Sequence, residues 1–146
     1  MDHNTSRIRI VLVDEHTEAR DALERRTRDH PRLQVVGATD SPETAVRLVV
    51  EQRPDVVLID IKRSDGRSGE TIPLLRALDA AIRPCIVVYV ALLTRAEEEA
   101  AGRLGADAVL LKQLSTAALA DDLAAVLGAA SCRTPDRTRA VQTRCC

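Results

Sequence analysis

Apolar and polar positions along the chain fall into two kinds of block. Short runs of consecutive apolar residues alternate with longer stretches in which apolar residues recur at helical spacing. A continuous apolar run is typical of a strand buried on both faces, as in a parallel sheet. The runs predict strands at residues 8–13, 33–38, 56–59, 84–90 and 108–111.

Helix signals fill the intervals between the expected strands. Ser41 followed by Pro42 is a strong pair of N-cap and first-turn residues, and Gly105 is a stop signal after an alanine- and glutamate-rich stretch. Further candidate N-caps are Thr17, Thr71 and Ser115. The expected helices cover approximately residues 17–29, 42–52, 72–78, 95–104 and 116–127.

Five strands that alternate with five helices predict an α/β fold. Parallel neighbours need helical crossovers, and right-handed crossovers place helices on both faces, so we expect a doubly wound five-stranded parallel sheet. The sequence shows no internal repeat and no second domain. The expected organisation is one domain over residues 1–127, followed by a polar C-terminal tail over residues 128–146.

Charged residues close three of the expected strands. Asp14 and Glu15 follow the first strand, Asp60 follows the third, and Lys112 follows the fifth. The carboxyl ends of parallel strands share one edge of the sheet, where open α/β sheets bind ligands. We therefore expect these four side chains to converge, although each charge taken singly could equally be a solvated residue or a cap.

The expected cluster indicates a metal ion and a phosphoryl group. Three carboxylates at one site raise one another's pKa unless a cation intervenes, and Mg²⁺ takes one or two carboxylates plus waters. Lys112 adds a positive charge suited to a phosphoryl oxygen. A carboxylate in this setting, such as Asp60, can attack phosphorus and form an acyl phosphate.

Composition excludes several other classes. The 22 acidic and 21 basic residues nearly cancel, and Tyr89 is the only aromatic residue among Phe, Trp and Tyr, so direct nucleic acid binding is not expected. The polar N-terminus predicts no signal peptide and no apolar run is long enough for a bilayer, so we expect a cytoplasmic protein without membrane contact. The four cysteines match no zinc spacing.

Three motifs carry a resemblance to a known family. They are VLVDEH with Asp14 and Glu15, VVLIDIK with Asp60, and GADAVLLKQ with Lys112. Over roughly residues 7–127 the chain resembles the receiver domain of bacterial two-component response regulators, which has a flavodoxin-like fold. No output domain follows in the sequence, so we expect either an atypical, stand-alone receiver or a shortened chain.

The resemblance implies a role for each of these residues. Asp60 is the implied phospho-acceptor, and Lys112 contacts the phosphoryl group. The implied Mg²⁺ ligands are Asp14, Glu15, Asp60 and the backbone carbonyl of Lys62. The implied partners are a sensor histidine kinase as phosphodonor and a downstream protein, or a second copy of the chain, that binds through the last two helices.

The sequence departs from the family at positions that usually respond to phosphorylation. Val90 stands where the fourth strand usually ends in a hydroxyl residue, Val109 replaces the usual aromatic of the fifth strand, and Gln113 replaces a proline. Tyr89 is adjacent to Val90 but belongs on the opposite face of the strand, and Thr94 is the nearest downstream hydroxyl. Our hypothesis is a domain that accepts a phosphoryl group but couples it weakly or differently to its output face.

Two other functions stay open. One is a pseudo-receiver, a protein-interaction module that does not use phosphorylation, which Val90 and Val109 favour and the intact Asp60 and Lys112 disfavour. The other is an enzyme, a metal-dependent phosphohydrolase of the haloacid dehalogenase type. That class places a second acid two residues after the nucleophile, where this chain has Lys62, so we do not expect an enzyme.

Overall fold

A five-stranded parallel sheet forms the centre of the protein. The computed structural model describes residues 7–61, 67–112 and 115–129. The strands in these ranges are β1 (Ile8–Val13), β2 (Leu33–Thr39), β3 (Val56–Ile59), β4 (Cys85–Val90) and β5 (Ala108–Leu111). They follow the order β2-β1-β3-β4-β5, and every neighbouring pair is parallel. The predicted doubly wound sheet is therefore confirmed.

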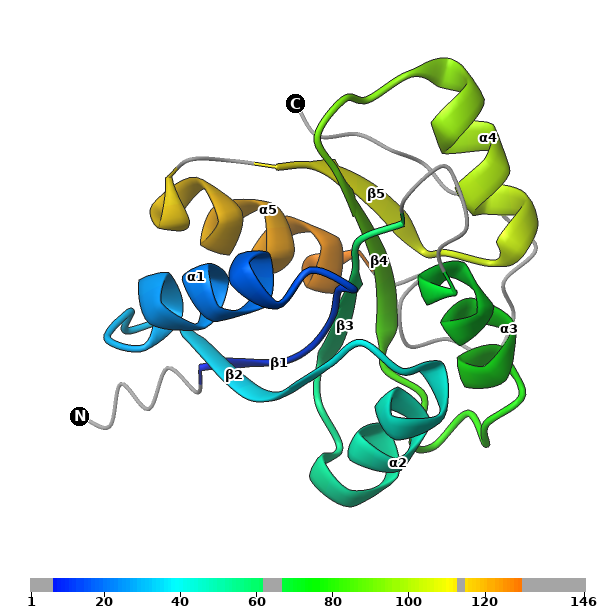
Figure 1. Ribbon diagram of the computed structural model, residues 1–146, viewed down its shortest axis with the longest axis horizontal. Coiled ribbons are helices and arrows are strands. Elements are labelled where there is room, and N and C mark those ends of the chain that lie inside the picture. Colours follow the sequence, from blue (N-terminus) through cyan, green and yellow to red (C-terminus); the bar gives the residue numbers. More distant parts are fainter. Residues whose placement is uncertain (1–6, 62–66, 113–114, 130–146) are drawn as a thin grey trace.

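Helices cover both faces of the sheet. Their bounds are α1 (Thr17–Thr27), α2 (Pro42–Gln52), α3 (Thr71–Arg76), α4 (Arg95–Leu104) and α5 (Thr116–Gly128), with a short 3-10 helix, η1 (Ser68–Glu70), before α3. Figure 1 shows α1 and α5 on one side of the strands and α2, α3 and α4 on the other. No helix in the described ranges has the length and apolar character needed to cross a membrane.

Two apolar layers form the core, one on each face of the sheet. The α1/α5 layer joins Leu23 of α1 and Leu119 of α5 to Leu58 of β3. The α2/α3/α4 layer joins residues such as Val49 of α2 to Ile59 of β3. All of β3 is buried, because both of its faces are covered. This explains the unbroken apolar run, and it means that the residue following β3 emerges directly at the sheet edge.

Three of the predicted helix boundaries are confirmed. Ser41 Oγ accepts the backbone N–H of Thr44 at 3.2 Å at the start of α2. Ser115 Oγ accepts the N–H of Ala118 at 3.2 Å at the start of α5. Gly105 ends α4 with a φ of 102°, in the left-handed region that glycine adopts more readily than other residues.

The caps predicted at Thr17 and Thr71 are wrong. Each threonine is the first residue of its helix, and the preceding residues, His16 and Glu70, occupy the N-cap positions without a side-chain cap bond. At α1 the turn is held by Asp14, whose Oδ1 accepts the His16 N–H at 2.8 Å. At α3 the 3-10 helix η1 runs directly into the α-helix, so no separate helix start is left to cap.

The left-handed φ of Gly105 leads to a prediction about the turn between α4 and β5. Gly105→Ala places a Cβ at a φ of 102° and 3.2 Å from Arg76 Cγ. We expect this strain to lower the free energy of unfolding by about 1–2 kcal/mol. Gly128→Ala is the control, because its Cβ meets nothing within 4 Å at the end of α5. Urea unfolding of both variants measures the difference, and equal midpoints would contradict the prediction.

Candidate functional site

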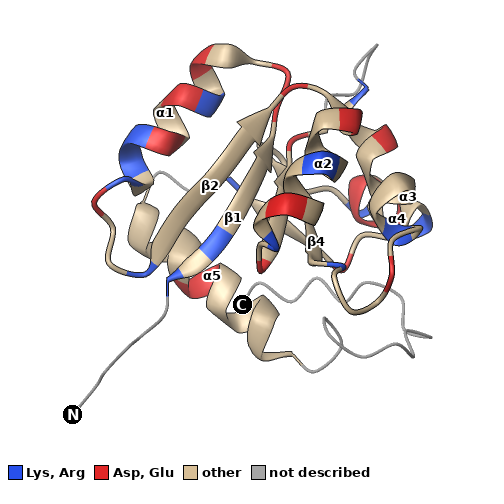
Figure 2. Ribbon diagram, turned by 90° about the horizontal axis from the view of Figure 1, so that it is seen from below, with Lys and Arg blue, Asp and Glu red and all other residues tan. Residues whose placement is uncertain are grey.

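The strand order brings the predicted charged residues to one edge of the sheet. β1 and β3 are neighbours with Val13 opposite Ile59, so Asp14 and Asp60 follow paired residues. The backbone N–H of Asp60 donates to Val13 O at 2.9 Å. Lys112 follows β5, which lies on the far side of β4 from β3. Figure 2 shows acidic segments where the arrowheads of β1 and β2 end.

Asp60 and Lys112 form an ion pair across this edge. Lys112 Nζ lies 2.7 Å from Asp60 Oδ2. The side chain of Asp60 is 6% exposed and that of Lys112 is 31% exposed, so the ammonium reaches a buried carboxylate from the partly solvated side. Removing the cation from such a pair leaves a buried carboxylate without this compensating charge, which is destabilising. The ion pair therefore favours a position of the lysine head group beside Asp60.

Asp14 is the second buried carboxylate of the site. Burial raises the pKa of Asp14, and the neighbouring Asp60 raises it further through charge repulsion and through a hydrogen bond between the two carboxyl groups. The His16 N–H and the Lys112 ammonium act in the opposite direction and lower the pKa. The net shift is upward, so the folded site disfavours the charged form of Asp14, mainly because the carboxyl is buried.

Glu15 is directed to a neighbouring segment. Its Oε1 accepts the backbone N–H groups of Arg67 and Ser68, the latter at 3.2 Å. These residues precede and begin η1, so Glu15 ties the end of β1 to the chain that follows β3. The site acid predicted from the sequence therefore has a structural role in this conformation.

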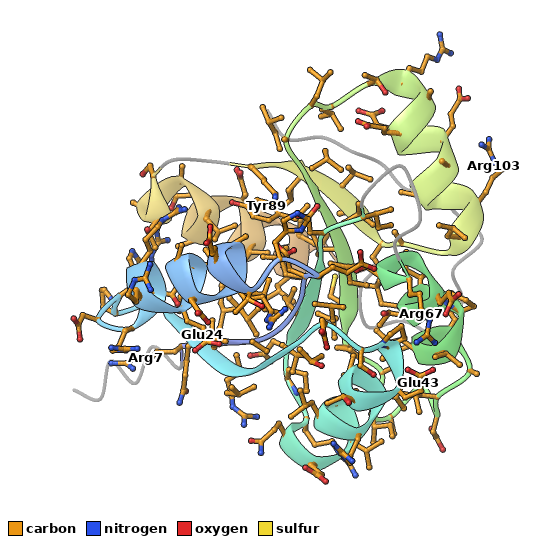
Figure 3. The ribbon with its side chains drawn as sticks, in the orientation of Figure 1. Arg7, Glu24, Glu43, Arg67, Tyr89 and Arg103 are labelled. Atoms are coloured by element: carbon orange, nitrogen blue, oxygen red, sulfur yellow. The ribbon has the colours of Figure 1, made fainter. Side chains whose placement is uncertain are left out.

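The Arg67 side chain holds this segment in place. Its Nη2 lies 2.7 Å from Glu43 Oε1 at the start of α2, and its Nε lies 3.1 Å from Glu70 Oε2 in η1. Figure 3 shows Arg67 and Glu43 side by side between α2 and α3. All three side chains are more than half exposed, and solvent screens ion pairs of this kind, so they contribute little to stability. They orient the segment more than they stabilise the fold.

The structure thus unites part of the predicted site. Asp14, Asp60 and Lys112 lie together, whereas Glu15 turns to the backbone before η1. The backbone carbonyl of Lys62, predicted as a metal ligand, lies outside the described residues. The contact from Glu15 joins two loops that are 52 residues apart, and no local sequence pattern signals it.

The positions that depart from the family are buried and aliphatic. Val90 and Val109 both belong to the α2/α3/α4 layer, and Val90 O accepts the backbone N–H of Lys112 at 2.7 Å. Thr94 caps α4, because its Oγ1 accepts the Glu97 N–H at 3.1 Å in a capping box. Gln113 lies outside the described residues. The Thr94 hydroxyl is therefore occupied by the helix that it begins.

Tyr89 is a site residue whose contact the sequence did not reveal. As predicted, it faces away from Val90, since it belongs to the α1/α5 layer. Lys112 Nζ nevertheless lies over its ring, 5.7 Å from the centroid. Its status as the only aromatic side chain in the sequence was the available signal.

The buried acids fit a hard divalent cation, although they do not form a complete ligand set. In the ranges described, no group of three or more His, Cys, Asp or Glu residues is arranged to hold a metal ion. Asp14 and Asp60 nevertheless supply two adjacent carboxylates with excess negative charge. Mg²⁺ commonly binds one or two carboxylates and keeps several waters, so this pair suits it.

Comparison with known proteins agrees with this geometry. The family described as response regulator receiver domain matches residues 10–124. The chain is 44% identical over 71 residues to the response regulator GacA of Pseudomonas viridiflava. The matched stretch covers 48% of this chain and 33% of GacA. It is 31% identical over 120 residues to the transcriptional regulatory protein LiaR of Bacillus subtilis, spanning 81% of this chain and 55% of LiaR. The chain thus corresponds to about a third to a half of these relatives.

A solved structure shares the whole architecture. The two-component response regulator of the LuxR family from Aurantimonas sp. SI85-9A1 has a TM-score of 0.70 and 27% sequence identity, over 93% of this chain and 96% of that one. This shared architecture agrees with the family match. The chain belongs to the response regulator receiver domain family of two-component signalling.

Proposed function

We propose that this receiver domain accepts a phosphoryl group on Asp60 in a Mg²⁺-dependent reaction. The observation that carries the proposal is the 2.7 Å contact between Asp60 Oδ2 and Lys112 Nζ at a buried sheet edge that also holds Asp14. One carboxylate oxygen of Asp60 forms a bond to phosphorus. The bond between phosphorus and the donor breaks, and the donor leaves with the electron pair. The product is an acyl phosphate on Asp60.

Lys112 supplies positive charge to the transferred group. When Asp60 becomes an acyl phosphate, its carboxylate charge is lost and the negative charge moves to the phosphoryl oxygens. A lysine ammonium is a compact charge on a flexible stem, so it can follow this charge over a short distance. A preformed cation beside the reacting oxygens favours the transition state over the ground state.

We propose that Asp14, Glu15 and Asp60 hold the Mg²⁺ ion together with the backbone carbonyl of Lys62. The role of Lys62 remains a prediction. When bound, Mg²⁺ neutralises charge on the transferring oxygens. Glu15 reaches this site from the β1 end, and it would have to share its carboxylate between the metal and the backbone before η1.

The proposed phosphodonor is a sensor histidine kinase, as the receiver family implies. We propose that a downstream protein, or a second copy of the chain, binds on the side of the last two helices. Leu92 before α4 is 66% exposed, and Leu104 at the end of α4 and Leu111 at the end of β5 are also exposed. Exposed apolar side chains of this kind on and beside α4 support a protein contact on this side.

The second candidate function is a pseudo-receiver that binds partners without phosphorylation. The burial of Val90 and Val109 in one apolar layer favours it, because neither side chain can hydrogen-bond a phosphoryl oxygen. The ion pair of Lys112 with Asp60 disfavours it. Phosphohydrolase activity is not proposed. Enzymes of the haloacid dehalogenase type need a second acid two residues after the nucleophile, and this chain has Lys62 there.

Labelling by acetyl phosphate tests the proposed function. In the presence of Mg²⁺ the wild-type chain is expected to gain a phosphoryl group, and Asp60→Asn is expected to gain none, measured by intact-protein mass spectrometry. Asp40→Asn is the matched control, because Asp40 is exposed and follows β2 at the same sheet edge. Equal labelling of Asp60→Asn would refute the assignment of Asp60. An unlabelled wild-type chain would favour the pseudo-receiver.

The raised pKa of Asp14 predicts a stability change on neutralisation. When the pKa of a carboxyl is higher in the folded than in the unfolded state, the free energy of unfolding falls as pH rises from the unfolded-state pKa to the folded-state pKa. Above the folded-state pKa the lost stability stays constant. Asp14→Asn removes the charge and keeps an oxygen that can accept the His16 N–H. We therefore expect Asp14→Asn to raise the unfolding temperature at pH 7 in metal-free buffer, with the gain vanishing below the ordinary pKa of aspartate, about 3.9.

Magnesium should act against this difference in unfolding temperature. The ion compensates the charge of the wild-type site, so Mg²⁺ is expected to raise the unfolding temperature of the wild type more than that of Asp14→Asn. Differential scanning fluorimetry with an extrinsic dye, with EDTA or with Mg²⁺, measures both effects. An Asp14→Asn variant that is less stable than the wild type in EDTA at pH 7 contradicts the prediction.

A further inference from the structure

Tyr89 contacts the reactive lysine from a strand that supplies none of the charged residues. Tyr89 is 5% exposed and lies in the α1/α5 layer, opposite Leu110 in the strand register. Lys112 Nζ lies 5.7 Å from the ring centroid and 2.7 Å from Asp60 Oδ2. Within the described residues, the ammonium therefore lies against both a carboxylate after β3 and an aromatic ring in β4. Figure 3 shows Tyr89 on the α5 side of the sheet.

The ring restricts where the ammonium can lie. A lysine side chain has four rotatable carbon–carbon bonds and loses rotamer entropy when its head group is held at one place. A partly exposed lysine with a single partner visits other positions. A cation within about 6 Å of a ring centroid is attracted to the face of the ring, and this second contact favours the rotamer that also reaches Asp60.

We propose that Tyr89 is a positioning residue that holds the Lys112 ammonium for the phosphoryl group on Asp60, and that the ammonium moves relative to the ring when that group is present. The proposal rests on the proposed function, since it assumes that Asp60 is phosphorylated. The movement follows from the chemistry, because the negative charge shifts from the carboxylate to the phosphoryl oxygens. The electrostatic field of the ammonium at the Tyr89 ring then changes. Because the ring packs in the α1/α5 layer, this change acts on that layer.

The location of Tyr89 gives this inference a direction. Val90 and Val109, which replace the usual responsive residues, lie in the α2/α3/α4 layer. Tyr89 lies in the opposite layer beside α1 and α5. An aliphatic side chain responds only to shape, whereas an aromatic ring responds to the position of a cation. Tyr89, which can respond to the position of the Lys112 ammonium, therefore lies on the face of the sheet opposite α4.

The kinetic test separates the ring from its hydroxyl and from its volume. Tyr89→Leu is expected to slow labelling by acetyl phosphate about three- to tenfold, the effect of losing a partly solvated cation–π contact. Tyr89→Phe keeps the ring and is expected to stay within about twofold of the wild type. Leu23→Ala, in the same layer on α1, is the control for a general loss of packing, with folding of each variant checked by circular dichroism.

The outcomes distinguish this inference from the function on which it rests. An unlabelled wild type would overturn both. A labelled wild type with Tyr89→Leu equally fast would overturn only the role of Tyr89. If Tyr89→Phe is labelled as slowly as Tyr89→Leu, the effect belongs to the hydroxyl, and the role of the ring is overturned. If Leu23→Ala is labelled as slowly as Tyr89→Leu, the effect belongs to packing, and the role of the ring is likewise overturned.

Tyrosine fluorescence supplies a second readout. If the Tyr89 ring only packed in the core, its emission would not respond to a phosphoryl group on Asp60. The chain contains no Trp, no Phe and a single Tyr, so its intrinsic emission reports on Tyr89 alone. Adding Mg²⁺ with beryllofluoride, a mimic of the phosphoryl group, is expected to change the emission intensity of the wild type and not that of Asp60→Asn or Lys112→Met. An unchanged wild-type emission in a chain that acetyl phosphate does label would overturn the proposed movement of the lysine.

Discussion

Buried negative charge at one edge of the sheet is the constraint on which the rest of this structure depends. Asp14 and Asp60 are both almost fully buried and their carboxyl groups contact each other. Such a pair persists only where positive charge compensates it. Lys112 supplies that charge from the end of β5, and its stem has to cross the end of β4 to reach Asp60. The strand order thus determines which residues lie beside the bridging lysine.

The compensation is incomplete, and the shortfall has a functional consequence. One ammonium faces two carboxylates, and the pKa of Asp14 is raised as a result of burial and of its neighbour. The two buried carboxylates therefore favour the binding of a further cation at this site. A bound divalent cation, as proposed above, would supply that positive charge. Stability at the site and readiness to bind a metal ion oppose each other.

Local patterns predicted the parts of the fold and site that depend on strands, and failed for contacts between loops. The apolar run of β3 marked a fully buried strand, so Asp14, Asp60 and Lys112 could be placed at one edge from strand ends alone. Glu15 could not be placed, because its partners are backbone N–H groups in a different loop. The wrong cap at Thr17 has a different, local cause, since the Asp14 carboxylate accepts the His16 N–H within the turn before α1.

The two faces of the sheet are unequal in their ability to sense a change at Asp60. A signal requires a group whose interactions differ between the two chemical states. Val90 and Val109 are aliphatic, so their interactions differ little between a carboxylate and an acyl phosphate. The ring of Tyr89 interacts with the Lys112 ammonium, and an interaction of this kind is worth about 0.5–2 kcal/mol. That range overlaps the lower part of typical coupling free energies, about 1–3 kcal/mol. One aromatic contact is therefore strong enough for modest coupling, directed toward α1 and α5.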